Sequence, residues 1–286
     1  MKLIVIPKSK EMIDKYINLG VNSFIIGLKD LSINFDLEMN IDEIKELNNK
    51  YTNLDLFISI NKNIFNDELN SLENSLIELD KLNIKGVLFY DLSIVYLKNK
   101  NNLKLDLVWN QNHMVTNYNT CNYYYSKGVK YALIAPEITL EEIKEIKDKS
   151  SISLITFGFG YPIMADSRRK LITNYFKSIN KESDKDSIEI YDEKNRFIVK
   201  EDRHGTTFFN KEFLNGISLI KEDVSDYIVY SDQFVDEDKS IEITKLILNL
   251  LNNYKEEYVD SLNNLIGNDT NFLFKKTIYM VKRNDK

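Results

Sequence analysis

Cysteine is almost absent from this sequence, since Cys121 is the single one in 286 residues. A disulfide within the chain and an all-cysteine metal or iron–sulfur site are therefore excluded, because each needs at least two thiolates. Histidine is nearly as scarce, and proton transfer by an imidazole can use only His113 or His204. From these residues we predict no metal centre and no cofactor.

Long apolar runs are also missing. No stretch approaches the roughly 18 apolar residues of a membrane span, and the first apolar run ends at Pro7, too early for a signal peptide. The net charge of −6, from 38 Lys and Arg against 44 Asp and Glu, argues against a generally basic surface but leaves room for a local basic patch. We expect a cytoplasmic protein with no membrane association.

Eight short apolar runs alternate with amphipathic helical segments along the chain. Each run is almost continuously hydrophobic, which is typical of a strand buried on both faces of a parallel sheet. The predicted strands are Lys2–Ile6, Ser23–Gly27, Asp55–Ile60, Gly86–Tyr90, Lys104–Trp109, Lys130–Ala135, Ile152–Phe157 and Asp226–Tyr230. This order predicts an α/β fold, a TIM-type (β/α)8 barrel, as a single domain over residues 1–286.

The connection after the seventh predicted strand is much longer than a loop and a helix require. It contains two strand-like runs, Ile188–Tyr191 and Phe197–Lys200, with five polar residues between them, a pattern that predicts a β-hairpin. We expect an insertion over about residues 159–210 that folds over the barrel mouth. A C-terminal tail over about residues 254–286 is expected to form a helix and then a strand at Phe272–Val281.

The ends of the strands should carry any chemistry, because barrel enzymes place their active sites on the loops that follow the strands. Asp91 ends a predicted strand and is a candidate general base, or else a cap for the helix that follows. His113 is the better placed of the two imidazoles for proton transfer, or else a hydrogen-bonding loop residue. Glu137 follows Pro136 and is the third catalytic candidate, unless it only favours the N-terminus of the next helix.

A second group of candidates would bind a ligand. Its members are polar, cationic or aromatic side chains predicted at the barrel mouth: Asn61, Asn110, Gln111, Tyr161, Arg168 and Arg169. The two arginines, followed by Lys170, suit a small anion, an RNA backbone or an acidic peptide, or else form a solvated charge run. The segment His204-Gly205-Thr206 is interpreted as a turn in which glycine supplies a positive φ.

Several segments match, in order, those of one known protein family. They are Gly20–Leu28, Asn61 with Asn66–Leu69, Gly86–Asp91, Asn110-Gln111 with Asn117, Gly128–Ile143, Phe157–Tyr175, Gly205-Thr206 and Phe274–Tyr279. Over its whole length the chain resembles the collagenase-like peptidase U32 family. The resemblance implies a peptidase or other hydrolase whose catalytic mechanism is unassigned.

The chain also departs from that family. Members that act as RNA-base or quinone hydroxylation factors hold an iron–sulfur cluster on a set of cysteines, whereas Arg169 and Lys170 stand here where such a thiolate is expected. The resemblance therefore implies a member without a cluster. Three hypotheses stay open: a U32-type peptidase acting through the mouth residues, an accessory protein of RNA modification with an anion site at the two arginines and Lys170, and a degenerate barrel that partners an intact paralogue.

Overall fold

The computed structural model describes residues 1–181, 187–192 and 195–275. Eight parallel strands in this part of the chain form a closed barrel. In chain order they are β1 (Lys2–Ile6), β2 (Ser23–Leu28), β4 (Asp55–Ile60), β5 (Gly86–Phe89), β6 (Leu107–Trp109), β7 (Tyr131–Ile134), β8 (Ser153–Gly160) and β14 (Tyr227–Ser231). Neighbouring strands pair in this order, and pairing of β14 with β1 and of β1 with β2 closes the ring. The predicted (β/α)8 barrel is confirmed.

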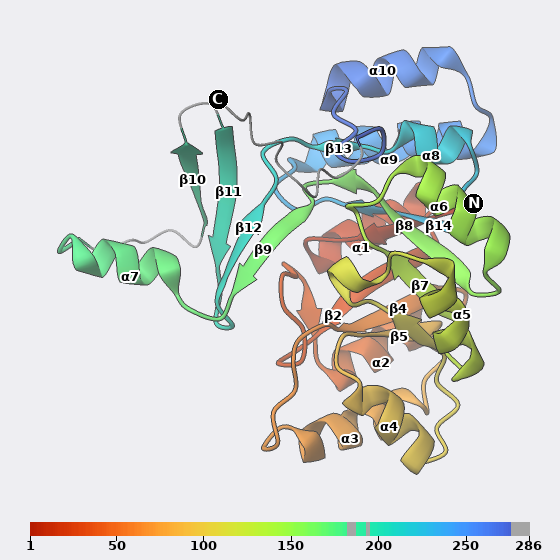
Figure 1. Cartoon of the computed structure of the whole chain (residues 1–286), viewed down its shortest axis with the longest axis vertical. Coiled ribbons are helices and arrows are strands. Elements are labelled where there is room, and N and C mark those ends of the chain that lie inside the picture. The colour runs from red at the N-terminus through yellow and green to blue at the C-terminus, as the bar shows by residue number, and fades with distance from the viewer. Residues whose placement is uncertain (182–186, 193–194, 276–286) are drawn as a thin grey trace, which may run out of the picture.

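Helices cover the outside of the barrel (Figure 1). They are α1 (Lys10–Asn18), α2 (Ile41–Lys50), α3 (Leu69–Leu79), α4 (Ser93–Lys100), α5 (Tyr118–Ser126), α6 (Leu140–Lys149), α8 (Ile217–Lys221), α9 (Glu237–Asn252) and α10 (Glu256–Ile266). Capping boxes begin α2 and α6, in which an Asn40 or Thr139 side chain accepts from the backbone of a glutamate three residues later. A 3₁₀ turn, Asn112–Met114, follows β6.

The inside of the barrel is filled by one or two apolar side chains from each strand. Phe57, Tyr131 and Tyr227 meet edge to face with ring centroids 5.7 to 6.1 Å apart. Tyr131 and Tyr227 are the first residues of β7 and β14, so this aromatic cluster closes the N-terminal end of the barrel. A cavity inside the barrel must therefore open at the other end, where the strands finish.

Two strand boundaries differ from the predicted ones by three residues, and the other differences are of one residue. β6 begins at Leu107 rather than Lys104, because the Asp80 carboxylate accepts hydrogen bonds from the backbone N–H groups of Lys104 and Leu105 at 2.7 and 2.8 Å. β8 continues to Gly160, where it pairs antiparallel with the short strand β13 (Leu214–Asn215). The other short strand, β3 (Glu38–Met39), pairs with the end of β2.

The connection between β8 and β13 carries a second sheet, which we call the arm (residues 163–209). It contains β9 (Ile163–Ser167), α7 (Leu171–Ser178), β10 (Ser187–Asp192), β11 (Asn195–Glu201) and β12 (Thr206–Phe209). The strands are antiparallel in the order β10-β11-β12-β9, and β10 with β11 is the predicted hairpin. Figure 1 shows α7 and β10 at the end of the arm that lies away from the barrel, while β9 and β12 lie beside it.

The C-terminal tail follows the prediction only in its helix. Residues 272–274, the first of the expected strand, lie in a turn, and residues 276–281 lie outside the described part of the chain. The turn forms because Leu273 is buried and its carbonyl accepts the N–H of Leu140 at the start of α6. Of the helices described, none has the length and apolar character needed to cross a membrane.

Candidate functional site

A chamber of about 170 Å³ lies at the C-terminal end of the barrel. Its floor is made by strand residues such as Leu88, Phe157 and Val229, and the arm covers it with Ile163 and Met164 from β9. We call it the apolar chamber, because aliphatic and aromatic side chains form most of its wall. The predicted position of the insertion over the barrel mouth agrees with this arrangement.

A larger chamber of about 480 Å³ opens beside it, and we call it the polar chamber. On the barrel side it is lined by the loop after β4, residues 61–65, and on the arm side by the end of β9 and the turn before β12. Five residues line both chambers and form the wall between them: Ile33, Asn34, Asn61, Asn112 and Asp166. A ligand in one chamber therefore lies next to the other.

Hydrogen bonds fix this shared wall. The Asn61 side chain accepts from the backbone N–H of Ile33 at 2.9 Å and donates to its carbonyl at 3.1 Å. The Asp166 carboxylate accepts from the Asn34 amide at 2.9 Å and from the Thr207 hydroxyl at 2.8 Å. The wall is thus preorganised, and the Asp166 oxygen that it uses is already satisfied within the protein.

Arg168 is the cation whose charge is least neutralised in the polar chamber. Its guanidinium lies 4.2 Å from the centroid of the Phe65 ring, and one nitrogen reaches the Asn63 carbonyl at 3.5 Å. Lys62 is ion-paired with Glu68, and Arg203 is also paired with acidic groups, whereas Arg168 makes no ion pair with any described residue. Arg168 can therefore receive an anion without breaking an existing pair.

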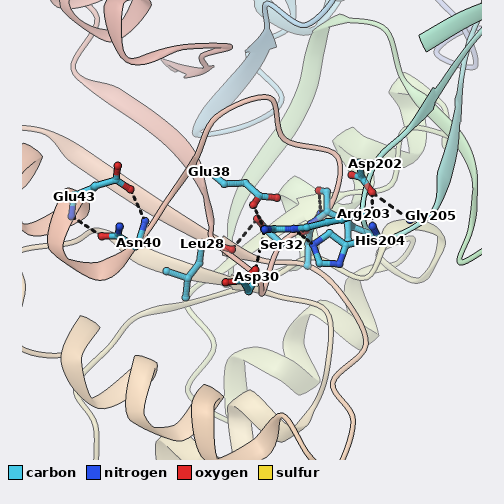
Figure 2. Close-up of polar contacts among 12 residues, drawn as sticks. Leu28, Asp30, Ser32, Glu38, Asn40, Glu43, Asp202, Arg203, His204 and Gly205 are labelled. Carbon is cyan, nitrogen blue, oxygen red and sulfur yellow. Dashed lines mark hydrogen bonds and ion pairs between the residues drawn. The ribbon is translucent and has the colours of Figure 1, made fainter. Parts of the chain in front are cut away.

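A tight turn holds His204 at the edge of the same chamber. The Asp202 carboxylate accepts the backbone N–H of His204 at 2.7 Å and of Gly205 at 3.2 Å. The Arg203 side chain reaches back to the barrel, where it pairs with Asp30, in the loop between β2 and β3, at 2.9 Å and with Glu38, the first residue of β3. Figure 2 shows Arg203 between these two carboxylates, with the His204 ring beside it. The turn expected from the sequence is present, and it also anchors the arm to the barrel.

Asp91, the first catalytic candidate, is engaged by the backbone. Its carboxylate accepts the N–H of Ser93 at 2.8 Å, at the start of α4, and the N–H of Ile64 at 3.1 Å. Partial burial acts to raise the pKa of Asp91, but these hydrogen bonds outweigh it, so the pKa lies below its usual value. The capping alternative accounts for this geometry, and a catalytic role for Asp91 stays a prediction.

His113 and Glu137 come together at the rim. Nδ1 of His113 lies 2.9 Å from a carboxylate oxygen of Glu137, and both side chains are about half exposed. His113 also lines the apolar chamber, whereas Glu137 and Asp91 line neither chamber. The structure thus pairs two of the three predicted catalytic residues and leaves the third at the start of its own helix.

The predicted ligand-binding residues are divided among several places. Asn61 lines both chambers, Asn110 and Tyr161 line the apolar one, and Arg168 lines the polar one. Gln111 instead links two strands, since its oxygen accepts from the Trp109 indole at 2.8 Å and its nitrogen donates to the Tyr90 carbonyl at 2.6 Å. Arg169 is exposed on the arm outside both chambers.

The residues present do not fit a cysteine-held cluster. Cys121 lies buried in α5, and burial raises the pKa of its thiol to about 11, which disfavours the thiolate needed for ligation. Among the described residues there is also no group of three His, Cys, Asp or Glu side chains that could hold a metal ion.

The sequence alone did not identify several lining residues. The loop residues Ile33, Asn34 and Phe35 carry no motif, and they reach the site only because β2 and β3 hold the loop against the arm. Phe65 is an isolated exposed aromatic residue until Arg168, distant in sequence, stacks on it. The sequence alone does not show that segments 33–35, 61–65 and 202–207 lie side by side in the fold.

Comparison with known proteins agrees with this architecture. A family model described as peptidase family U32 matches residues 8–226. The chain is 24% identical over 313 residues to "tRNA hydroxylation protein P2" of Bacillus subtilis (strain 168), covering 97% of this chain and 99% of that protein. It is 29% identical over 169 residues to "Uncharacterized protease MJ0090" of Methanocaldococcus jannaschii, covering 56% of this chain and 40% of that protein.

Two further matches are more distant. "tRNA hydroxylation protein P1" of B. subtilis is 24% identical over 149 residues, which cover 52% of this chain and 35% of that protein. The solved structure of the U32 peptidase Mk0906 superposes with a TM-score of 0.51 at 15% identity, covering 81% of this chain and 92% of that chain, and so supports the fold. With a family match over most of its length and a barrel of the same kind, this chain belongs to peptidase family U32.

Proposed function

We propose that this U32 protein acts in tRNA hydroxylation by binding tRNA on the basic side of its arm. The near-complete coverage of the B. subtilis relative named for tRNA hydroxylation supports this assignment. A tRNA substrate also agrees with the cytoplasmic location expected from the sequence.

The observation that carries the proposal is a local concentration of positive charge. Residues 163–181 contain five cations, which are all exposed: Arg168, Arg169, Lys170, Lys177 and Lys181. The same stretch has one acidic residue, Asp166, although the whole chain has a net charge of −6. Exposed Tyr175 and Phe65 lie among or beside these cations, and such a mixture suits a phosphate backbone with unstacked bases.

The oxidation itself is not assigned to the residues of this chain. The single thiol is buried and the described residues offer no metal-binding group, so their part is to bind and position the RNA. An intact U32 paralogue is the proposed partner for the chemical step. A second B. subtilis relative named for the same process supports this part of the proposal.

The test is tRNA binding, measured by fluorescence anisotropy with labelled tRNA. A triple variant, Arg168→Gln, Arg169→Gln and Lys170→Gln, should bind at least tenfold more weakly. Its control removes three exposed lysines elsewhere, by Lys45→Gln, Lys104→Gln and Lys127→Gln, and should bind like the original protein. Equal weakening by the two triple variants, or no tRNA binding by the original protein, would refute the proposal.

A hydrolytic function is the second candidate, and the contact between His113 and Glu137 favours it. The carboxylate would orient the imidazole as a general base beside the apolar chamber. Incubation with a library of fluorogenic peptides tests this role. Cleavage that His113→Gln abolishes would establish it, whereas the absence of cleavage, or cleavage unchanged in that variant, would eliminate it.

A further inference from the structure

The polar chamber contains two hydrogen-bond donors that the described residues leave largely or wholly unused. One is the guanidinium of Arg168, held over Phe65 with a single weak contact to a carbonyl. The other belongs to the ring of His204, which the sequence had indicated only as part of a turn. Whether this ring offers a donor to the chamber depends on which of its nitrogens carries the proton.

The contact between Arg203 and His204 fixes the proton's position. Nε of Arg203 lies 3.0 Å from Nε2 of His204. An arginine side chain can only donate, so Nε2 must be the acceptor and carries no proton. In the neutral ring the proton is then on Nδ1, for which no described residue is an acceptor.

Arg203 is itself held in place. Its two terminal nitrogens contact Asp30, in the loop that follows β2, at 2.9 Å, and Glu38, the first residue of β3. Figure 2 shows the Arg203 guanidinium between the two carboxylates, with the imidazole of His204 next to it. The two carboxylates hold the guanidinium, and the guanidinium fixes the tautomer of the ring, in the way that second-sphere groups orient metal-bound histidines.

The ring is also kept neutral. Partial burial lowers the pKa of His204, and the charges of Arg203 and Lys62 lower it further against the opposing effect of Asp202 and Asp30. At neutral pH the side chain therefore offers one N–H donor and no positive charge. The chamber therefore has one cationic donor, the guanidinium of Arg168, and one neutral donor, Nδ1–H of His204.

The two acidic residues of the chamber, Asp166 and Asp202, are both engaged by neighbouring donors. Oδ1 of Asp166 accepts from Asn34 and Thr207, and Oδ1 of Asp202 accepts from two backbone N–H groups, so one oxygen of each carboxylate is held within the fold. Lys62 offsets Glu68 at the barrel side. Among the cations that line the polar chamber, Lys62 and Arg203 are ion-paired, whereas Arg168 makes no ion pair with a described residue.

We propose that the polar chamber binds a phosphate group, with the guanidinium of Arg168 and Nδ1–H of His204 as its donors. This rests on the proposed function in that the phosphate is taken to be one phosphodiester of the bound tRNA. A free small phosphate has the same chemistry and would bind the same two donors. His204 is thus a specificity-determining residue, because only an acceptor oxygen can face its Nδ1–H.

Nuclear magnetic resonance of the side-chain nitrogens tests the tautomer directly. The chain has only two histidines, so His113→Gln leaves His204 as the single imidazole and assigns its signals. We expect protonated Nδ1 and unprotonated Nε2 at neutral pH, and loss of this preference in Arg203→Gln. A ring protonated on Nε2 in the original protein would overturn the inference.

Titration with inorganic phosphate tests the site. Phosphate should shift the Nδ1 signal of His204, and Arg168→Gln should weaken phosphate binding about tenfold or more. His204→Asn and His204→Gln form a matched pair, because the asparagine amide lies near the position of Nδ1 and the glutamine amide near that of Nε2. The asparagine variant should keep most of the affinity, and the glutamine variant should lose about tenfold.

The same variants separate this inference from the proposed function. If tRNA displaces phosphate from His204, both stand and the phosphate belongs to RNA. If phosphate binds at His204 but tRNA does not bind the protein, the site stands with a free phosphate as its ligand and the proposed function falls. If phosphate leaves His204 unshifted and His204→Gln binds tRNA normally through the basic stretch, this inference falls alone.

Discussion

Gly205 has a backbone conformation and surroundings that only glycine tolerates. Its φ is +147°, and a Cβ atom there would lie 2.0 Å from the Ser167 carbonyl oxygen. Gly205→Ala should therefore lower the free energy of unfolding by about 2 kcal/mol or more, because the turn or β9 must move.

Gly20→Ala provides the matched control in the same urea titration. Gly20 also has a positive φ, +95°, but a Cβ atom there meets nothing within 4 Å. We expect Gly20→Ala to lower the free energy of unfolding by about 1 kcal/mol, because of the positive φ alone. Equal destabilisation by the two variants would show that the close approach to Ser167 is unimportant.

Asp232 is a buried acid that should make stability depend on pH. One of its oxygens accepts from the Tyr16 hydroxyl at 2.7 Å, and the other has no hydrogen-bond partner among the described residues. Burial raises the pKa of Asp232 to about 7, against the effects of Tyr16 and Lys8 and together with that of Asp36. The folded protein thus holds a proton over a range in which the unfolded chain has lost it.

Stability should consequently fall as the pH rises from about 4 to about 7, since the native state binds more protons there. Asp232→Asn removes this loss, and should unfold at a higher urea concentration than the original protein at pH 8, by up to a few kcal/mol in free energy. At pH 4 the difference should be small. The assignment would be contradicted if the difference in unfolding free energy between Asp232→Asn and the original protein were the same at pH 4 and at pH 8.

At the residue scale, sequence reasoning identified candidates by type and position but not by environment. Arg168 and Asn61 were predicted at the site and line its chambers, because strand ends and the signature segment are recognisable from local sequence. His204 was interpreted as a turn residue, since nothing in its neighbours reveals that Arg203 pairs with Asp30 and Glu38. Contacts between segments so far apart follow from tertiary structure alone.

At the scale of elements, α6 shows how a local signal fixes a boundary. Thr139 accepts from the backbone of Glu142, while the Glu142 side chain accepts from the Thr139 backbone at 2.7 Å. Thr139→Ala should cost about 1 kcal/mol of unfolding free energy, because a backbone N–H at the helix start loses its partner. Thr139→Ser keeps a hydroxyl and should retain most of that stability in the same thermal or urea unfolding. Equal loss in the two variants would assign the effect to the methyl group instead.

Strands of the barrel were predictable because each is a buried, nearly continuous apolar run, so the eight segments stand out before any pairing is known. The C-terminal segment was wrongly predicted as a strand in its first residues for the same reason, since Phe272 and Leu273 are apolar. In the fold Leu273 is buried in a turn against the start of α6, and apolar composition cannot separate these cases. Such a pattern indicates burial rather than strand pairing.

At the scale of the whole molecule, the proposed RNA binding would be opposed by the acidic barrel and favoured by the basic stretch of the arm. The net charge of −6 repels RNA at long range, while the five cations of residues 163–181 attract it locally. At 0.1 M salt the Debye length is about 10 Å, so the repulsion between charges that are further apart is largely screened. Direct contacts between cations and phosphates still release counterions from the RNA. The logarithm of tRNA affinity should therefore fall with the logarithm of salt concentration, with a slope set by the arm.

The triple variant Arg168→Gln, Arg169→Gln and Lys170→Gln should reduce that slope by about 2, at roughly 0.7 to 0.9 for each phosphate that it no longer neutralises. The control Lys45→Gln, Lys104→Gln and Lys127→Gln makes the same change in net charge, and should leave the slope as it is. Anisotropy titrations at several salt concentrations measure both slopes. Equal slopes for the two triple variants would mean that net charge, rather than the cations of the arm, governs RNA binding. The arm would then not be the docking surface.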